Sequence, residues 1–235
     1  PGLAGPDQRL VLVAGLVAAM VLPVLLFGRP RPMPHLMLDD ASPDERIRHA
    51  KRSAAARMWL VRLLVQIAEA ALFAYLLIWF TSIDPTFTDS ETARVFSIVL
   101  ALSVPLALLA GRWSDRRERP ILPLALGSAI GSIGLLLMAI SDNLGGAIAG
   151  YVVFGLSTSV FLALHTSQTL RVLPKPSMRG RDLGIFNLTN TVPSLIMPWL
   201  TLALVPVFGF SALFFTLAAL VALGTALLLT LVKTK

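Results

Sequence analysis

The stretch Gly111-Arg112-Trp113-Ser114-Asp115-Arg116-Arg117-Glu118-Arg119 decides the fold class, because it concentrates charge in a short turn between two long apolar runs. These runs lie near residues 93–112 and 120–140. Each is long enough to cross roughly 30 Å of hydrocarbon as a helix. A charged turn between two such helices indicates a helical hairpin in a membrane.

The composition of the whole chain indicates the same class. Hydrophobic residues make up 56% of it, charged residues only 14%, and the mean hydropathy is +0.78. Soluble domains do not have this composition. Apolar runs of spanning length lie near residues 10–27, 59–83, 93–112, 120–140, 146–171, 183–206 and 210–232. The sequence therefore predicts an all-α integral membrane protein with seven candidate transmembrane helices.

The charged turn resembles the loop signature of the major facilitator superfamily, G-x-x-x-D-R-x-G-R. Gly111, Asp115, Arg116 and Arg119 match this pattern, and Glu118 stands at its second glycine. The resemblance implies that the matching residues form a conformational gate. In the family, the Asp and Arg of this loop help to close the cytoplasmic side, and this copy would contact a helix of the other half of the transporter. The alternative is that the charges only anchor the hairpin to the cytoplasmic side.

The resemblance also implies a domain organisation, because members of the family have twelve helices in two related halves. Residues 1–27 would hold the last transmembrane helix of the N-terminal half, and residues 28–58 the cytoplasmic connector. Residues 59–235 would form the C-terminal six-helix transporter domain. We expect the chain to be a fragment whose partner is the missing N-terminal six-helix half. A half-size protein that dimerises is the alternative.

The connector contains the start of a further helix. Ser42 can cap free N–H groups, Pro43 suits the first helical position, and Glu45 stands at the third position of a capping box. These residues predict a short amphipathic, basic helix over about 43–57, which lies along the membrane surface and leads into the next span.

The positive charges give the orientation, because Lys and Arg of short loops stay on the cytoplasmic side. Only Arg9 and Arg94 lie on the opposite side, and Arg62 lies inside a helix; all other Lys and Arg residues fall in 28–58 and the loops on its side. The C-terminus is therefore predicted to be cytoplasmic. The net charge of +7 reflects this topology, so contact with the lipid bilayer is expected and nucleic-acid binding is not.

Other classes of chemistry have little support in the sequence. The chain has no Cys, which excludes disulfides and thiol-bound metals and suits a bacterial inner membrane. No His-rich, paired-carboxylate or nucleophile–base pattern occurs at helical spacing, so we expect neither an enzyme nor a cofactor.

Glu69 is the candidate for proton coupling. It is the only carboxylate well inside an apolar run, about 15 Å beyond Trp59 at 1.5 Å per residue, which places it near the middle of the bilayer. Gln66 lies one turn earlier on the same face and is a candidate for the solute cavity. Arg62 lies close enough to the interface to extend its charge outward. The alternative for Glu69 is a fixed pair with a neighbouring helix.

The run 146–171 contributes further cavity candidates, because Thr158, His165 and Gln168 fall on one stripe of a helix. Such a stripe lines a cavity or a seam between helices. For His165, an ordinary hydrogen bond is the alternative to a role in transport. The spacings Gly127-x-x-x-Gly131 and Gly146-x-x-x-Gly150 predict close packing of helices.

The run 183–206 places amides inside the membrane. Asn187, Asn190 and Thr191 share one helical face that can bind a polar solute, and Pro193 allows the helix to bend. The segment G-x-x-x-G-I-F-N followed by Pro resembles the corresponding helix of sugar:cation symporters. Ser194 stands where those proteins usually have Gln.

Together these features predict a secondary active transporter of a small solute, working by alternating access and coupled to protons. Uptake of a sugar-like solute and efflux of amphipathic or drug-like compounds both remain open. From another class, a non-transporting six-helix membrane scaffold or receptor is the alternative.

Overall fold

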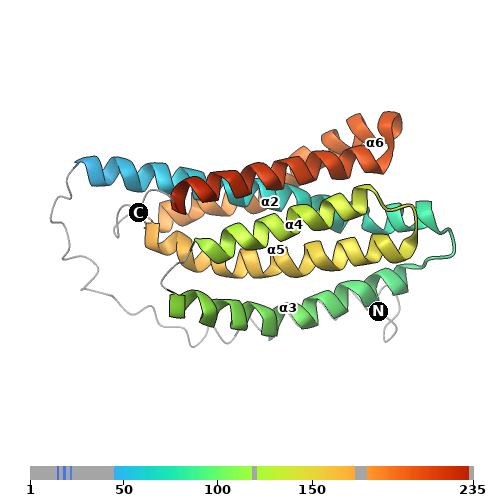
Figure 1. The fold of residues 1–235 in the computed structure, drawn as a ribbon, viewed down its shortest axis with the longest axis horizontal. Coiled ribbons are helices and arrows are strands. Elements are labelled where there is room, and N and C mark those ends of the chain that lie inside the picture. Colours follow the sequence, from blue (N-terminus) through green and yellow to red (C-terminus); the bar gives the residue numbers. More distant parts are fainter. Residues whose placement is uncertain are drawn as a thin grey trace. The chain divides into compact units, whose positions relative to one another are not determined.

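The computed structural model describes residues 45–117, 121–172 and 179–232, together with residues 15, 18, 19 and 22. The chain divides into two units, residues 1–41 and 42–235. In the first unit the four described residues are helical, and the rest of the predicted helix 10–27 lies outside the described residues. In the second unit every described element is a helix (Figure 1): α2 (Glu45–Ile83), α3 (Asp89–Arg117), α4 (Leu122–Ala139), α5 (Leu144–Val172) and α6 (Arg179–Val232).

These five helices confirm the predicted all-α membrane class, because each contains a segment long and apolar enough to cross a membrane. α2 differs from the prediction. It runs for 39 residues without interruption, so the short helix expected over 43–57 is the first part of the same helix that contains the apolar span. The reason lies in the sequence, since no Gly or Pro occurs between Glu45 and Ile83 to end the helix.

The turn between α2 and α3 is defined by side-chain caps. Asp84 precedes a proline, which disfavours helical geometry, and its Oδ1 accepts hydrogen bonds from the backbone N–H and the hydroxyl of Thr86, at 2.9 and 2.7 Å. Thr88 and Glu91 then form a capping box: the backbone N–H of Thr88 donates to Oε2 of Glu91 at 2.8 Å, and that of Glu91 donates to Oγ1 of Thr88 at 3.3 Å.

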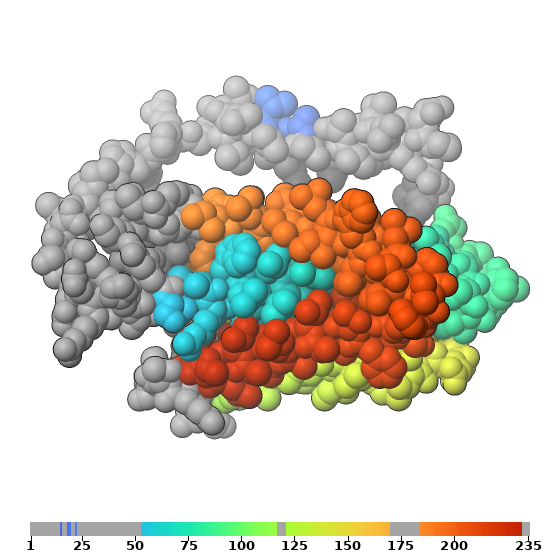
Figure 2. Space-filling model, turned by 90° about the horizontal axis from the view of Figure 1, so that it is seen from above, coloured from blue at the N-terminus to red at the C-terminus, as the bar shows by residue number. Residues whose placement is uncertain are grey.

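α6 is 54 residues long and is interrupted at Gly209, where φ is 77° and ψ is 178°. Its two ends contact the same part of α2. Trp59 Nε1 donates to the carbonyl of Ile185 at 2.9 Å, and an Arg57 guanidinium nitrogen donates to Oγ1 of Thr230 at 3.1 Å. α6 therefore doubles back at Gly209 into two arms (Figure 1), and Figure 2 shows α2 between them. The interruption lies between the predicted runs 183–206 and 210–232.

α4 and α5 pack with their backbones in contact. A Cβ on Gly134 would lie 2.6 Å from the backbone nitrogen of Phe154, and one on Gly150 would lie 2.7 Å from Cγ of Met138. Cβ atoms on Gly127 and Gly131 would approach Ser157 to 3.3 and 3.2 Å. The glycines thus permit the close approach that the small-residue spacing predicts.

The outer faces of the helices are apolar. On α4 exposed positions recur every three or four residues, which is one stripe of a helix: Leu126, Ile130, Ile133 and Leu137. α3 is more exposed still, because only 11% of its most apolar segment is buried, and it packs mainly against α5. Apolar surface of this extent suits contact with lipid or with another membrane segment.

Candidate functional site

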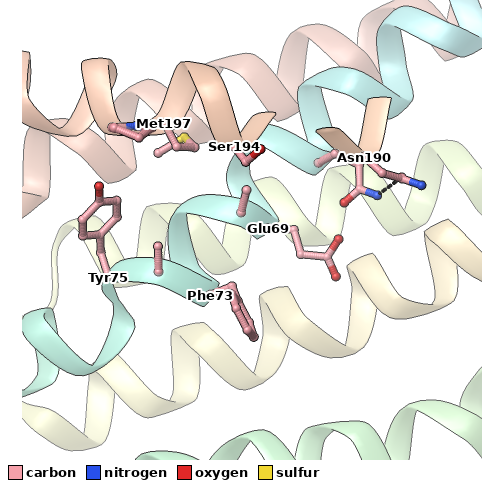
Figure 3. A pocket seen from close by; sticks show the side chains of 10 residues that line it. Glu69, Phe73, Tyr75, Asn190, Ser194 and Met197 are labelled. Carbon is pink, nitrogen blue, oxygen red and sulfur yellow. Dashed lines mark hydrogen bonds between the residues drawn. The ribbon is translucent and has the colours of Figure 1, made fainter. Parts of the chain in front are cut away.

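Glu69 lies in the wall of two cavities. The first has a volume of about 420 Å³ and lies between α2 and the first arm of α6. Besides Glu69 it is lined by a few polar side chains and several apolar ones, among them Gln66, Phe73, Asn190, Ser194 and Met197. Figure 3 shows Glu69 and Phe73 projecting from α2, with Ser194 and Asn190 on the facing helix.

The second cavity has a volume of about 480 Å³ and lies between α2, α3 and α5. Aromatic rings from all three helices line it: Phe73, Phe96, Tyr151 and Phe154. The rings of Phe96 and Tyr151 pack edge to face, with centroids 5.3 Å apart. Glu69 and Phe73 line both cavities, so a single turn of α2 separates the two spaces.

The Glu69 carboxylate is half-buried, and among the described residues it makes no hydrogen bond and no ion pair. The described helices therefore hold no fixed pair with Glu69 in this conformation. The charge of Arg62, seven residues earlier on α2, acts on Glu69 across this distance. Two turns of helix separate the two groups, so they attract each other without touching. The carboxylate thus lies in the wall of both cavities without such a partner in the described part of the chain.

A polar bridge connects α2 to α6 at one end of the first cavity. Gln66 Nε2 donates to Oδ1 of Asn190 at 2.7 Å, and Nδ2 of Asn190 donates to Oδ1 of Asn187 at 2.8 Å. Arg62 contributes two further contacts, from Nη1 to Oγ1 of Thr166 at 3.0 Å and from Nη2 to Oδ1 of Asn190 at 3.4 Å. The guanidinium is therefore held between α2, α5 and α6 in this conformation.

This polar bridge borders a third, smaller cavity of about 120 Å³. Its walls come from α2, α5 and α6 and consist of Arg62, Thr166, Thr169, Phe186, Asn187 and Asn190. Asn190 lines this cavity and the first one, so the two spaces meet at its side chain.

The structure separates the predicted residues of α5. Thr158 is 1% exposed and lines the second cavity, and its hydroxyl donates to the carbonyl of Phe154 at 2.9 Å. His165 is 0% exposed, and its Nε2 lies 2.9 Å from the carbonyl of Met58 on α2. Because a carbonyl only accepts, Nε2 carries the proton. His165 therefore lies at an interhelix contact, and neither it nor the buried Gln168 lines the three cavities described above.

On α6, the structure brings Asn187 and Asn190 to cavity walls but not Thr191. The hydroxyl of Thr191 donates to the carbonyl of Leu188 in its own helix at 3.3 Å.

The sequence did not predict Thr166 or the aromatic residues around Glu69 as part of the site. Phe73 carried a usable signal, because it lies four residues after Glu69 and so shares its helical face.

The predicted turn is wrong for the described part of the charged stretch, because residues 111–117 continue α3 as its last turns. Asp115 and Arg116 are exposed, and Gly111 is half-buried, with its missing Cβ position 3.7 Å from Leu164 Cδ2. That is an ordinary contact distance, so packing alone does not demand a glycine there. Arg119 lies outside the described residues.

Comparison with known proteins gives one family. The profile of the Major Facilitator Superfamily matches residues 9–175 and, in a second match that overlaps the first, residues 58–235. Together the matches include every helix of the second unit. No curated protein matches the chain significantly.

Proposed function

We propose, from the premise that this chain belongs to the Major Facilitator Superfamily, that it moves a small solute by alternating access and that Glu69 couples the movement to protons. Membership of the family implies secondary transport and no enzymatic activity. The observation that carries the proton role is the position of Glu69, whose carboxylate has no partner among the described residues and lies in the wall of two cavities.

The six-span arrangement is part of this proposal. An α-helix rises about 1.5 Å per residue, so roughly 20 residues cross the membrane, whereas α6 has 54. Because α6 doubles back at Gly209, each arm supplies one span. The arms with α2, α3, α4 and α5 would then form the six-helix C-terminal half. The N-terminal half would supply the opposite wall of the solute pathway and the partner of the gate residues Gly111, Asp115, Arg116 and Arg119.

The solute contacts follow from the same cavities. Gln66 and Asn190 present amides to the first cavity beside Glu69, Asn187 presents one to the small cavity, and Thr158 lines the second. Hydrogen-bonding side chains on an otherwise apolar wall are typical of binding sites for small solutes. Movement of α2 against α6 on one side, or against α3 and α5 on the other, would change which cavity admits the solute and the proton.

A specific observation favours amphipathic compounds as the second candidate class of solute. The second cavity has four aromatic rings in its wall and further apolar side chains beside them, among them Leu72, Val99 and Leu100. Such a lining favours flat, apolar molecules over sugars, whose many hydroxyls need hydrogen-bond partners. The resemblance of the segment around Asn187 to sugar:cation symporters favours the opposite solute class.

The test is transport by Glu69→Gln in proteoliposomes. We expect the variant to lose accumulation driven by an imposed proton gradient but to keep exchange of labelled solute at equal concentrations, because exchange needs no net proton movement. The probes are a panel of labelled sugars and of amphipathic dyes. Asp142→Asn is the matched control, since Asp142 is an exposed carboxylate between α4 and α5. Undiminished gradient-driven accumulation by Glu69→Gln would remove the coupling role.

A further inference from the structure

Arg62 carries a charge among helices without an acidic partner. Its hydrogen bonds go to a hydroxyl and an amide, and no ion pair within 4.0 Å is formed among the described residues. Its Nε is buried and has no hydrogen-bond partner among the residues that the structure describes. Charged groups inside a membrane usually face a partner or a pathway, because desolvation of an unpaired charge is costly. Arg62 therefore lacks one strong acceptor.

The geometry indicates what that acceptor would be. The Nε and Nη2 atoms form one edge of the planar guanidinium, which suits two oxygens of a carboxylate or phosphate. On this edge Nε has no acceptor, and the Nη2 contact to Asn190 is long, at 3.4 Å. The Nη1 atom on the other side already has a 3.0 Å contact to Thr166. An oxyanion can thus bind this edge by replacing the weaker of the two existing contacts.

The small cavity beside Arg62 has the donors that an oxyanion needs. Asn187 uses its Oδ1 to accept from Asn190, and in the described part of the chain its Nδ2 makes no hydrogen bond. A volume of about 120 Å³ has room for a carboxylate or phosphate group. The larger cavity of about 420 Å³ adjoins it at Asn190 and has Ala70, Phe73 and Met197 in its wall. When the head group of a solute binds in the small cavity beside Arg62, its apolar body extends into this larger cavity.

We propose that Arg62 and Asn187 bind the carboxylate or phosphate group of an amphipathic organic anion, whose apolar body lies in the cavity shared with Glu69. The proposal rests on the transport function above, because it names the class of solute. An anionic lipid offers the same head-group chemistry, so the experiment separates a soluble anion from a lipid.

The experiment measures thermal unfolding of the purified protein that contains this chain, in detergent at constant ionic strength. The probes are benzoate and phenyl phosphate, with benzamide as the neutral analogue. We expect a saturable rise in Tm of roughly 3 °C or more with both anions and none with benzamide, because a ligand that binds only the folded state stabilises it. Arg62→Gln should lose the rise, and Arg62→Lys should keep part of it, since Lys retains the charge but not the bidentate edge.

Arg57→Gln is the matched control. Arg57 lies on the same helix, bonds Thr230, and lines none of the three cavities. We expect this variant to keep the full rise in Tm with benzoate. An equal rise in the wild type, Arg62→Gln and Arg62→Lys would overturn the site, and so would an equal rise with benzamide.

One further arm separates a soluble anion from a lipid. In nanodiscs, stabilisation by phosphatidylglycerol over phosphatidylcholine, with no effect of benzoate or phenyl phosphate, would assign the site to lipid and overturn the solute proposal.

Failure of this inference is distinct from failure of the transport function. Absence of anion binding, with loss of proton-driven accumulation in Glu69→Gln, removes the oxyanion site alone. Anion binding with full accumulation in Glu69→Gln removes the proton role alone.

Discussion

The amide nitrogen of Gln66 donates a 2.7 Å hydrogen bond to Oδ1 of Asn190, and this contact joins α2 to the first arm of α6 at the edge of the Glu69 cavity. The same oxygen accepts the longer contact from Arg62. Asn190 thus connects three polar side chains from two helices. Any relative movement of the two helices must break or exchange these bonds.

Asn190→Ala should therefore lower the apparent affinity for solute more than stability. We expect KM to rise about tenfold, since one hydrogen bond near a ligand is worth about 1 kcal/mol and the bridge that shapes the cavity is lost as well. The unfolding free energy should fall by only about 0.6 kcal/mol, because interhelix polar contacts in membranes are weak on average. Concentration-dependent uptake and thermal unfolding measure the two quantities.

Asn187→Ala is the control for this variant, because it removes the contact to Nδ2 of Asn190 and leaves the contact to Gln66. A smaller rise in KM is expected for neutral solutes. If both variants bind and transport like the wild type, the bridge has no part in shaping the solute site.

Much of the fold could be predicted from the sequence, and the reason is the membrane itself. Long apolar runs bounded by charge must form helices there, because no water satisfies the backbone. Helix ends were less predictable. Local composition near residue 58 changes from basic to apolar, yet the structure continues one helix through it, since hydropathy alone does not break backbone hydrogen bonds.

The candidate site was predictable only in part. Burial of a carboxylate in an apolar run singled out Glu69, and amide spacing singled out Asn187 and Asn190. The partners of Arg62 were not predictable, because Thr166 and Asn190 lie far from it in the chain and meet it only through packing of three helices. A stripe on α5 likewise could not distinguish His165, which faces α2, from Thr158, which faces a cavity.

Gly134→Ala should be among the most destabilising single-methyl changes in α4. Its Cβ would lie 2.6 Å from the backbone nitrogen of Phe154 and 2.9 Å from the carbonyl oxygen of Gly150, and backbone atoms cannot rotate away. Overpacking of this kind costs about 1–3 kcal/mol. Thermal unfolding in detergent should show a fall in Tm of several degrees.

Gly184→Ala is the matched control, because a Cβ there has nothing within 4 Å. Ala also favours a helix over Gly by about 1 kcal/mol, so this variant should unfold at the same or a higher temperature. Equal Tm values for the two variants would mean that α4 and α5 are not in the close contact described.

The orientation can be tested with single cysteines, because the chain has none of its own. Asp142→Cys lies in the turn between α4 and α5, and Arg116→Cys lies in the charged segment at the end of α3; both positions are exposed. The positive-inside rule predicts that an impermeant maleimide labels Asp142→Cys in intact cells and labels Arg116→Cys only after permeabilisation. The reverse pattern would place the charged turn outside and contradict the proposed cytoplasmic gate.

His165 offers the clearest separation of a structural from a transport role. Its Nε2 bonds the carbonyl of Met58, its Nδ1 lies 3.2 Å from Oγ1 of Thr169, and its ring lies near Phe161 and Phe186. Replacement by Leu leaves the ring contacts partly filled but removes both polar ones, which should lower the free energy of unfolding by about 1–3 kcal/mol. Transport per folded molecule should stay near the wild-type rate, with an unchanged dependence on the proton gradient. If His165→Leu instead folds normally and loses proton-driven accumulation as Glu69→Gln does, His165 belongs to the coupling pathway.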